Sequence, residues 1–148
     1  MPTHAQKQRL PYSQARLFDL VANIERYPEF LPWCVACRVT RRDGDVISGD
    51  LAVGFRMFRE TFASRVTLTR PDRIDVEYVD GPFRFLKNHW RFIAEGPSST
   101  TIDFFIDFEF RSKLLAVAIG PLFDEAVRRM VGAFEKRADA LYGSEQRG

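Results

Sequence analysis

The feature that most constrains the fold is a ten-residue stretch in which apolar and polar side chains alternate. In residues 101–110, isoleucine or phenylalanine occupies every even position, and the odd positions are mostly threonine, aspartate and glutamate. A period of two is typical of a β-strand with one buried and one wet face. The sequence therefore predicts a sheet whose apolar face must be covered by another layer.

The middle of the chain repeats this alternation in shorter runs. Three further strands are predicted over 59–69, 73–79 and 87–94. Turn-forming residues separate the runs at 43–45, 71–72, 80–82 and 96–98. Short strands joined by short turns predict an antiparallel meander.

Helices are predicted at both ends of the chain. Ser13 is a favourable N-cap for a helix over 14–23. Near the C-terminus, a helix over 121–142 would be about 33 Å long, with 114–119 as its kinked first part. One stripe of this helix is apolar: Phe123, Val127, Met130, Phe134 and Leu141. A cavity left between such a helix and a curved sheet would suit a large apolar ligand.

Composition excludes several classes of protein. The 148 residues predict a single domain over 1–142 with a frayed polar tail over 143–148. The 22 basic and 20 acidic residues are too balanced for an electrostatic DNA binder. The longest apolar stretch, 114–123, is shorter than the roughly 20 residues that span a membrane, although it can touch a membrane surface. We recognise no signal peptide in the sequence, so we expect a cytoplasmic protein.

Motifs for catalysis or metal binding are weak. No nucleophile elbow, phosphate-binding loop or dinucleotide fingerprint occurs. Cys34 and Cys37 form a CxxC spacing, but only His4 and His89 remain to complete a four-ligand metal site. Strand residues three apart point to opposite faces. We therefore interpret the two cysteines as structural and predict no metal.

Some polar residues share the face of apolar neighbours. Glu60 and Ser64 have the parity of Phe62, and Asn88 has the parity of Trp90. An inward polar group needs a partner, so these side chains either orient a ligand's polar head or lie in water at the open end of the sheet. Glu60 is also the best candidate for a general acid or base.

Three blocks of the sequence resemble one family. The segment DLVANIERYPEFLPWC over 19–34 resembles the signature of the coenzyme Q-binding START-domain family. That family belongs to the START-like, polyketide cyclase-like helix-grip superfamily. Residues 81–92 resemble its second block, and 123–138 resemble its C-terminal helix. On residue chemistry alone, the rigid turn over 27–34 is equally consistent with core packing and with a cavity wall or gate.

The resemblance implies an α+β fold in which about seven antiparallel strands wrap around the C-terminal helix, with two short helices after the first strand. It implies ubiquinone binding without catalysis or a required cofactor, as a lipid chaperone or carrier that supports cellular respiration. By motif position, Leu31 and Trp33 belong to the cavity entrance. Together with the strand and helix patterns, the candidate ligand contacts are Phe30, Leu31, Trp33, Phe62, Ser64, Phe83, Leu86, Asn88, Trp90, Phe104, Phe123, Val127 and Met130, with Glu60 as a polar anchor.

Two alternative functions are carried forward. Close relatives of the family are described as ribosome-associated toxins that block subunit joining, which would require an RNA-facing surface. A cyclase or hydrolase of an aromatic polyketide-like substrate would instead require an inward Glu60. For the quinone carrier, we expect contact with the inner face of a membrane through 114–123.

Overall fold

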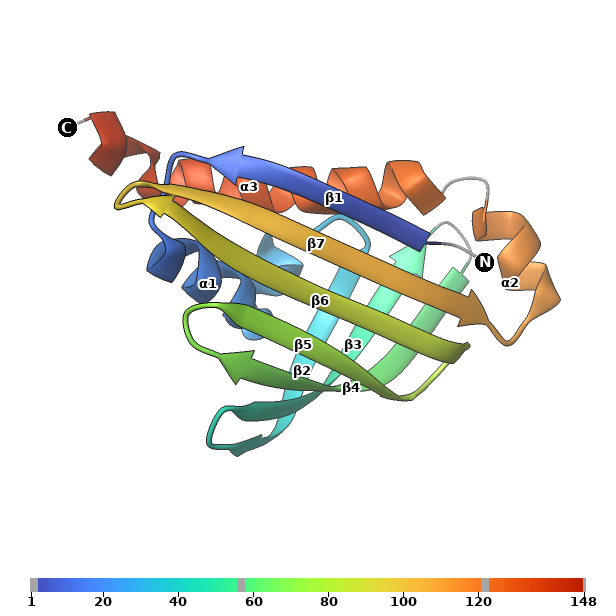
Figure 1. The fold of residues 1–148 in the computed structure, drawn as a ribbon. Helices are drawn as coiled ribbons and strands as arrows, with labels where there is room; N and C mark the ends of the chain where they lie inside the picture. Colours follow the sequence, from blue (N-terminus) through green and yellow to red (C-terminus); the bar gives the residue numbers. More distant parts are fainter. Residues whose placement is uncertain (1–2, 56–57, 121–122, 148) are drawn as a thin grey trace.

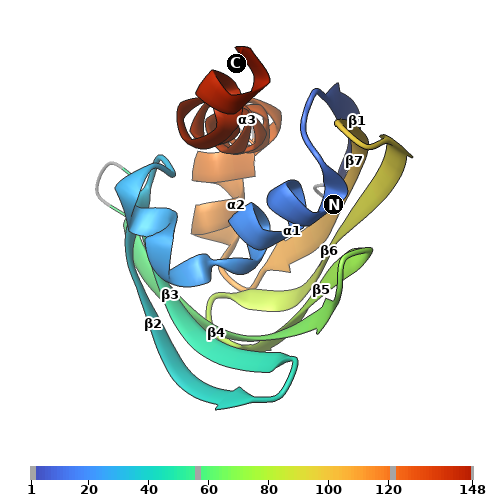
Figure 2. The same ribbon diagram turned by 90° about the vertical axis from the view of Figure 1, so that its left-hand side faces the viewer.

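The computed structural model is a curved antiparallel sheet that wraps around a long C-terminal helix (Figures 1 and 2). It describes residues 3–55, 58–120 and 123–147. The sheet has seven strands, as the family resemblance implied, in the order β1-β7-β6-β5-β4-β3-β2. The elements are β1 (Thr3–Leu10), α1 (Gln14–Ala22), the 3₁₀ helix η1 (Ile24–Glu29), β2 (Cys34–Asp43), β3 (Val46–Phe55), β4 (Phe58–Thr69), β5 (Arg73–Asp80), β6 (Phe83–Gly96), β7 (Ser99–Phe110), α2 (Lys113–Ile119) and α3 (Phe123–Arg147).

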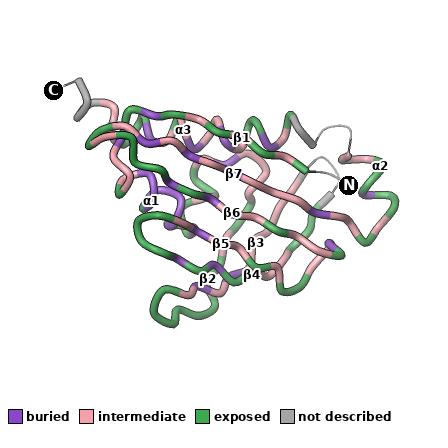
Figure 3. The backbone as a smooth tube through the Cα atoms, viewed as in Figure 1, coloured by how far each residue is buried: buried purple, intermediate pink, exposed green. Residues whose placement is uncertain are grey.

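The alternating stretch forms β7, the strand that joins the N-terminal strand β1 to the rest of the sheet. β7 pairs with β6 on one side and with β1 on the other. Its even residues Ile102, Phe104 and Phe108 are buried, as their period of two predicted. Figure 3 shows buried segments on α1, α3 and the central strands, whereas the turn between β2 and β3 is exposed. The core therefore lies inside the curve of the sheet.

The first helix fills one end of this curve. The Ser13 hydroxyl accepts a hydrogen bond from the Arg16 amide at 3.3 Å, which is the predicted N-cap. Leu17 and Phe18 are each only 1% exposed and pack into the core. Figure 2 shows α1 lying between the sheet and α3. The helix therefore closes the sheet at the end where α3 finishes.

The C-terminal helical region differs from the prediction in two ways. Residues 113–119 form a separate helix, α2, which begins at the cap formed by the Ser112 hydroxyl and in which Leu115 is buried. In addition, α3 continues to Arg147, five residues beyond the predicted end at Tyr142. Across the described ranges, no helix combines the length and apolarity needed to cross a bilayer.

Candidate functional site

An apolar cavity of about 160 Å³ lies between the sheet, η1 and α3. Strands β2–β7 contribute most of its wall, and Met130 and Phe134 of α3 contribute its roof. Side chains on the concave face reach it because strand residues alternate between faces. Its lining residues are Ile24, Tyr27, Leu31, Cys37, Gly49, Asp50, Leu51, Phe62, Ser64, Val66, Ile74, Val76, Leu86, Asn88, Trp90, Phe104, Ile106, Met130 and Phe134.

One side of the cavity is covered by η1 and by Leu31, two residues after it. Ile24, Tyr27 and Leu31 all line the cavity. The Tyr27 ring meets Phe134 edge-on at 5.3 Å, and its hydroxyl donates to the Val21 carbonyl. Burial, the dominant cause, raises the pKa of Tyr27, so the phenol stays protonated. Tyr27 thus connects the 3₁₀ turn to both α1 and α3.

A glycine allows η1 to lie this close to the sheet. A Cβ atom at Gly49 would lie 3.1 Å from the Arg38 carbonyl oxygen and 3.5 Å from Ile24 Cδ1. Even alanine would therefore crowd the backbone of β2, and a side chain longer than that of alanine would in addition meet Ile24 of η1.

An ion pair fastens η1 to α3. Arg137 Nη2 lies 2.9 Å from Glu29 Oε1, and its guanidinium lies 5.1 Å from the centre of the Phe30 ring. Phe30 in turn meets Phe134 edge-on at 5.2 Å. Arg26 also binds Glu29 at 2.7 Å, and these bonds lower the pKa of the Glu29 carboxyl, with Arg26 the largest cause. The part of the chain that covers the cavity therefore has a layer of aromatic rings, with charged groups on the outer side of these rings.

A cluster of rings closes the end of the cavity opposite α1. Phe83 is buried at its centre and lies 5.6 Å from Phe62, 5.5 Å from Tyr78, and 5.2 Å from both Phe108 and Phe110. We call these five residues the aromatic plug. Phe62 is the member that also lines the cavity. A ligand passing through this end would have to displace rings rather than backbone.

Besides Asp50, the mostly apolar wall contains two uncharged polar side chains, Ser64 and Asn88. Asn88 Nδ2 donates to the Phe105 carbonyl at 2.8 Å, which leaves its Oδ1 free to accept a hydrogen bond. The Ser64 hydroxyl makes no hydrogen bond to any residue that the structure describes. A ligand carbonyl can therefore accept a hydrogen bond from Ser64 without displacing an existing one.

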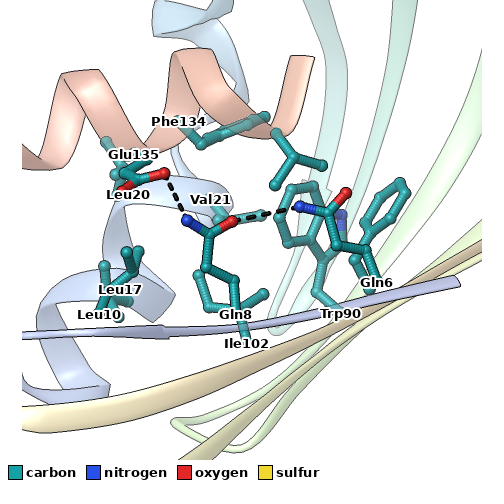
Figure 4. A pocket seen from close by; sticks show the side chains of 12 residues that line it. Gln6, Gln8, Leu10, Leu17, Leu20, Val21, Trp90, Ile102, Phe134 and Glu135 are labelled. Carbon is teal, nitrogen blue, oxygen red and sulfur yellow. Dashed lines mark hydrogen bonds between the residues drawn. The ribbon is translucent and has the colours of Figure 1, made fainter. Parts of the chain in front are cut away.

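A second, much smaller void lies between β1, α1 and α3 (Figure 4). Its volume of about 10 Å³ is close to the minimum for one water molecule. Gln6 donates to Gln8 at 3.2 Å, and Gln8 donates to Glu135, so these inward polar groups satisfy one another. This void shares Trp90, Phe104 and Phe134 with the larger cavity. It is too small to hold more than a solvent molecule.

The structure brings together most of the residues that the sequence pointed to. Eight of the predicted contacts line the cavity: Leu31, Phe62, Ser64, Leu86, Asn88, Trp90, Phe104 and Met130. Phe83 and Val127 are buried beside the cavity rather than in its lining. The side chain of Phe123 lies outside the described residues.

Three predicted positions differ because of local backbone geometry. The η1 turn directs Phe30 against Phe134 and Arg137, outside the lining. Trp33 adopts a positive φ of 65° and its carbonyl accepts the Gly54 amide, and its side chain does not reach the cavity. Glu60 is exposed near the start of β4, because the cavity ends at Phe62. The prediction of Glu60 as a polar anchor was therefore wrong.

A β-bulge changes the faces of the two cysteines. The register between β2 and β3 shifts between Cys34 and Ala36, and the extra residue reverses the alternation. Both thiols consequently pack against the core, and Cys37 reaches the cavity. The expectation that they face opposite ways was wrong. Burial is the main cause that raises both pKa values, that of Cys34 to about 11.

Several lining residues were missed by sequence reasoning. Ile74 and Val76 share the inward parity that was recognised for β5, and Phe134 belongs to the recognised helix stripe. These could have been found by treating every inward residue as a candidate. Ile24, Cys37 and Gly49 gave no such signal, since the 3₁₀ turn and the bulge decide their positions.

A curved antiparallel sheet that grips a helix around an apolar cavity defines a helix-grip fold of the START type. The chain shares this fold with a START superfamily protein from Mycobacterium smegmatis, with a TM-score of 0.81 at 19% identity over 94% of this chain and 98% of that one. Residues 10–135 match the family described as polyketide cyclase / dehydrase and lipid transport. The protein belongs to this family.

Two sequence relatives carry functional names. The chain is 38% identical to ribosome association toxin RatA of Pseudomonas aeruginosa, over 97% of this chain and all of that protein. It is 32% identical to the mitochondrial coenzyme Q-binding protein COQ10 homolog B of Xenopus laevis, over 97% of this chain and 60% of that protein. The family thus includes proteins named for lipid binding, for ribosome association and for polyketide cyclisation.

Proposed function

We propose that the protein binds a polyisoprenoid quinone of the ubiquinone type in this cavity and acts as its carrier. The observation that carries the proposal is the apolar cavity with a hydroxyl in its wall, that of Ser64, which has no hydrogen-bond partner among the described residues. A quinone ring offers two carbonyl acceptors and an isoprenoid tail offers only apolar surface. The relative named as a coenzyme Q-binding protein supports the same ligand class. Respiratory electron transport is the process that such a carrier would serve.

The size of the cavity limits what is held at one time. An engineered cavity of about 150 Å³ holds one benzene ring, and this cavity is about 160 Å³. An unsubstituted ring or a short piece of isoprenoid chain therefore fits without movement. A complete molecule requires displacement of η1 or of the aromatic plug, which would enlarge the cavity toward the roughly 300–1,000 Å³ of ordinary ligand sites.

Lipid extraction of the purified protein, followed by mass spectrometry, tests the proposal. Val76→Phe places a ring inside the cavity, because Val76 lines it. Val79→Phe is a matched control on the same strand, since Val79 is 55% exposed. We expect ubiquinone to copurify with the wild type and the control, and to be lost from Val76→Phe. Equal quinone contents in the two variants, or none in the wild type, would refute this site.

The thiol of Cys37 provides a second, independent measure of occupancy. In a Cys34→Ser background, alkylation at mildly alkaline pH reports on Cys37 alone, since the sequence has two cysteines. Added short-chain ubiquinone should slow the reaction because Cys37 lines the cavity. An unchanged alkylation rate at saturating quinone would contradict binding here.

Ribosome association is the second candidate function. It is favoured by the full-length similarity to a protein named as a ribosome association toxin, at higher identity than the quinone-binding relative. Overexpression followed by sucrose-gradient analysis tests it. Separation of the ribosomal subunits, with binding that weakens as salt rises, would support this function. Intact ribosomes and no comigrating protein would exclude it.

A cyclase-type reaction has less support in the cavity. The candidate acid or base, Glu60, is exposed and does not line the cavity. Asp50 is the carboxylate in the lining, but it pairs in register with Ala63, on the face of the sheet opposite Ser64. Ser64 and Asn88 are hydrogen-bonding groups, neither of which is an acid or base near neutral pH. We therefore do not propose catalysis.

A further inference from the structure

We propose that α2 docks on the surface of an anionic lipid membrane. Two of its apolar side chains face solvent: Leu114 is 71% exposed and Val117 is 74% exposed. They lie three residues apart and so occupy one face of the helix. Leu115, in contrast, is 6% exposed and anchors the helix to the domain. The exposed face is therefore fixed in place and available for contact.

Basic side chains accompany this apolar face. Arg111 and Lys113 lie at the start of α2, and Arg84 lies near the start of β6; all three are exposed. None of them forms an ion pair with a residue in the described part of the chain. Apolar side chains beside unpaired basic groups match the interface of a bilayer that contains anionic lipid. This charge complementarity favours a lipid surface as the occupant.

The position of α2 connects this surface to the cavity. The Arg111 amide donates to the Pro82 carbonyl and its Nε donates to the Phe83 carbonyl, both at 2.9 Å. These bonds hold the start of α2 against the strand that carries the centre of the aromatic plug. Figure 1 shows α2 at the opposite end of the molecule from the C-terminal end of α3. Docking would therefore bring the plugged end of the cavity to the lipid.

This arrangement deepens the proposed function, since it gives a quinone carrier a place to exchange its ligand with a membrane. The docking itself does not depend on quinone binding. It can be measured with vesicles that contain no quinone, so failure of one proposal leaves the other standing.

Co-sedimentation with unilamellar vesicles tests the docking. The probes are phosphatidylcholine vesicles with and without phosphatidylglycerol, at low salt, with the full chain. The double variant Leu114→Glu/Val117→Glu removes the apolar face. Leu141→Glu is the matched control, because Leu141 is a 44% exposed leucine on α3 at the other end of the molecule. We expect the wild type and the control to bind the anionic vesicles, and the double variant to bind at least tenfold more weakly.

A charge variant separates the electrostatic contribution from the apolar one. Arg84→Glu/Lys113→Glu leaves the bonds of Arg111 intact and should reduce binding to anionic vesicles several-fold, with little effect on residual binding to phosphatidylcholine. Circular dichroism checks that each variant is folded. Absence of wild-type binding to anionic vesicles would overturn the proposal, as would equal binding by the double variant and the Leu141 control. A surface that binds ribosomes but not vesicles would assign α2 to a macromolecular partner instead.

Discussion

Phe134 is the residue through which α3, η1 and the sheet meet, and its ring geometry makes a quantitative prediction. It is 3% exposed and meets Tyr27 at 5.3 Å, Phe30 at 5.2 Å and Trp90 at 4.9 Å, each edge to face or nearly so. Each such pair contributes about 0.5–1.5 kcal/mol beyond burial. Phe134→Leu keeps most of the apolar volume, and a volume-conserving swap usually costs less than about 1.5 kcal/mol. We therefore expect the free energy of unfolding to fall by about 2–4 kcal/mol.

A matched substitution isolates the contribution of the three rings. Phe92 is 2% exposed but contacts one described ring, Phe18, at 5.6 Å. Phe92→Leu should lower the free energy of unfolding by about 1–2 kcal/mol, on the same values for ring pairs and volume.

Urea unfolding followed by circular dichroism measures both variants. With an m-value of about 2 kcal/mol/M, the midpoint should fall by about 1–2 M for Phe134→Leu and by less than about 1 M for Phe92→Leu. Equal losses in the two variants would refute the reasoning, since burial alone would then account for both.

Three further substitutions test the ion pairs of Glu29 in η1 and the backbone at two glycines. Glu29→Gln removes the carboxylate whose pKa is lowered by Arg26 and then by Arg137; the wild type should be the more stable protein at neutral pH, and the two should converge in pH-dependent thermal melts as the pH falls through the lowered pKa. Gly132→Ala, where an added Cβ meets nothing within 4 Å in α3, should raise stability by about 0.5–1 kcal/mol, and a lower melting temperature would contradict this. Gly81→Ala, at a φ of 147° and with its Cβ 2.5 Å from a neighbouring side chain, should destabilise by more than about 1 kcal/mol in the same melts.

Much of the fold could be predicted because its signals are local. The alternation over 101–110 and the Ser13 cap depend on a few neighbouring residues, and both appear in the structure. A kink after residues 114–119 was predicted, but their separation as α2 was not, because it accompanies burial of Leu115 and packing of α2 against β7. The bulge after Cys34 likewise has no sequence signature of its own, yet it reverses the faces of the residues around it.

The lining residues of the candidate site could be predicted where strand parity decides which way a side chain points. The boundaries of the cavity could not be predicted. Ser64 and Glu60 have the same parity on β4, but Ser64 lines the cavity and Glu60 lies beyond it. After η1, the geometry of the turn decides which of two adjacent residues faces the cavity. Leu31 lines the cavity, and Phe30 packs against Phe134 instead. Neither boundary can be read from spacing, because both depend on where distant elements meet.

The pairing of β1 with β7 has a consequence for how the chain folds as it is synthesised. All other sheet neighbours are consecutive strands, whereas Thr3 and Asp107 are hydrogen-bonded across 104 residues. The first strand therefore leaves the ribosome long before its only partner exists, while the later hairpins can form in turn. Its sequence suits that delay: over Thr3–Leu10, every residue except Ala5 and Leu10 is polar or charged. An unpaired strand of this kind offers little apolar surface to other nascent chains, so β1 itself is a poor site for aggregation before β7 is made.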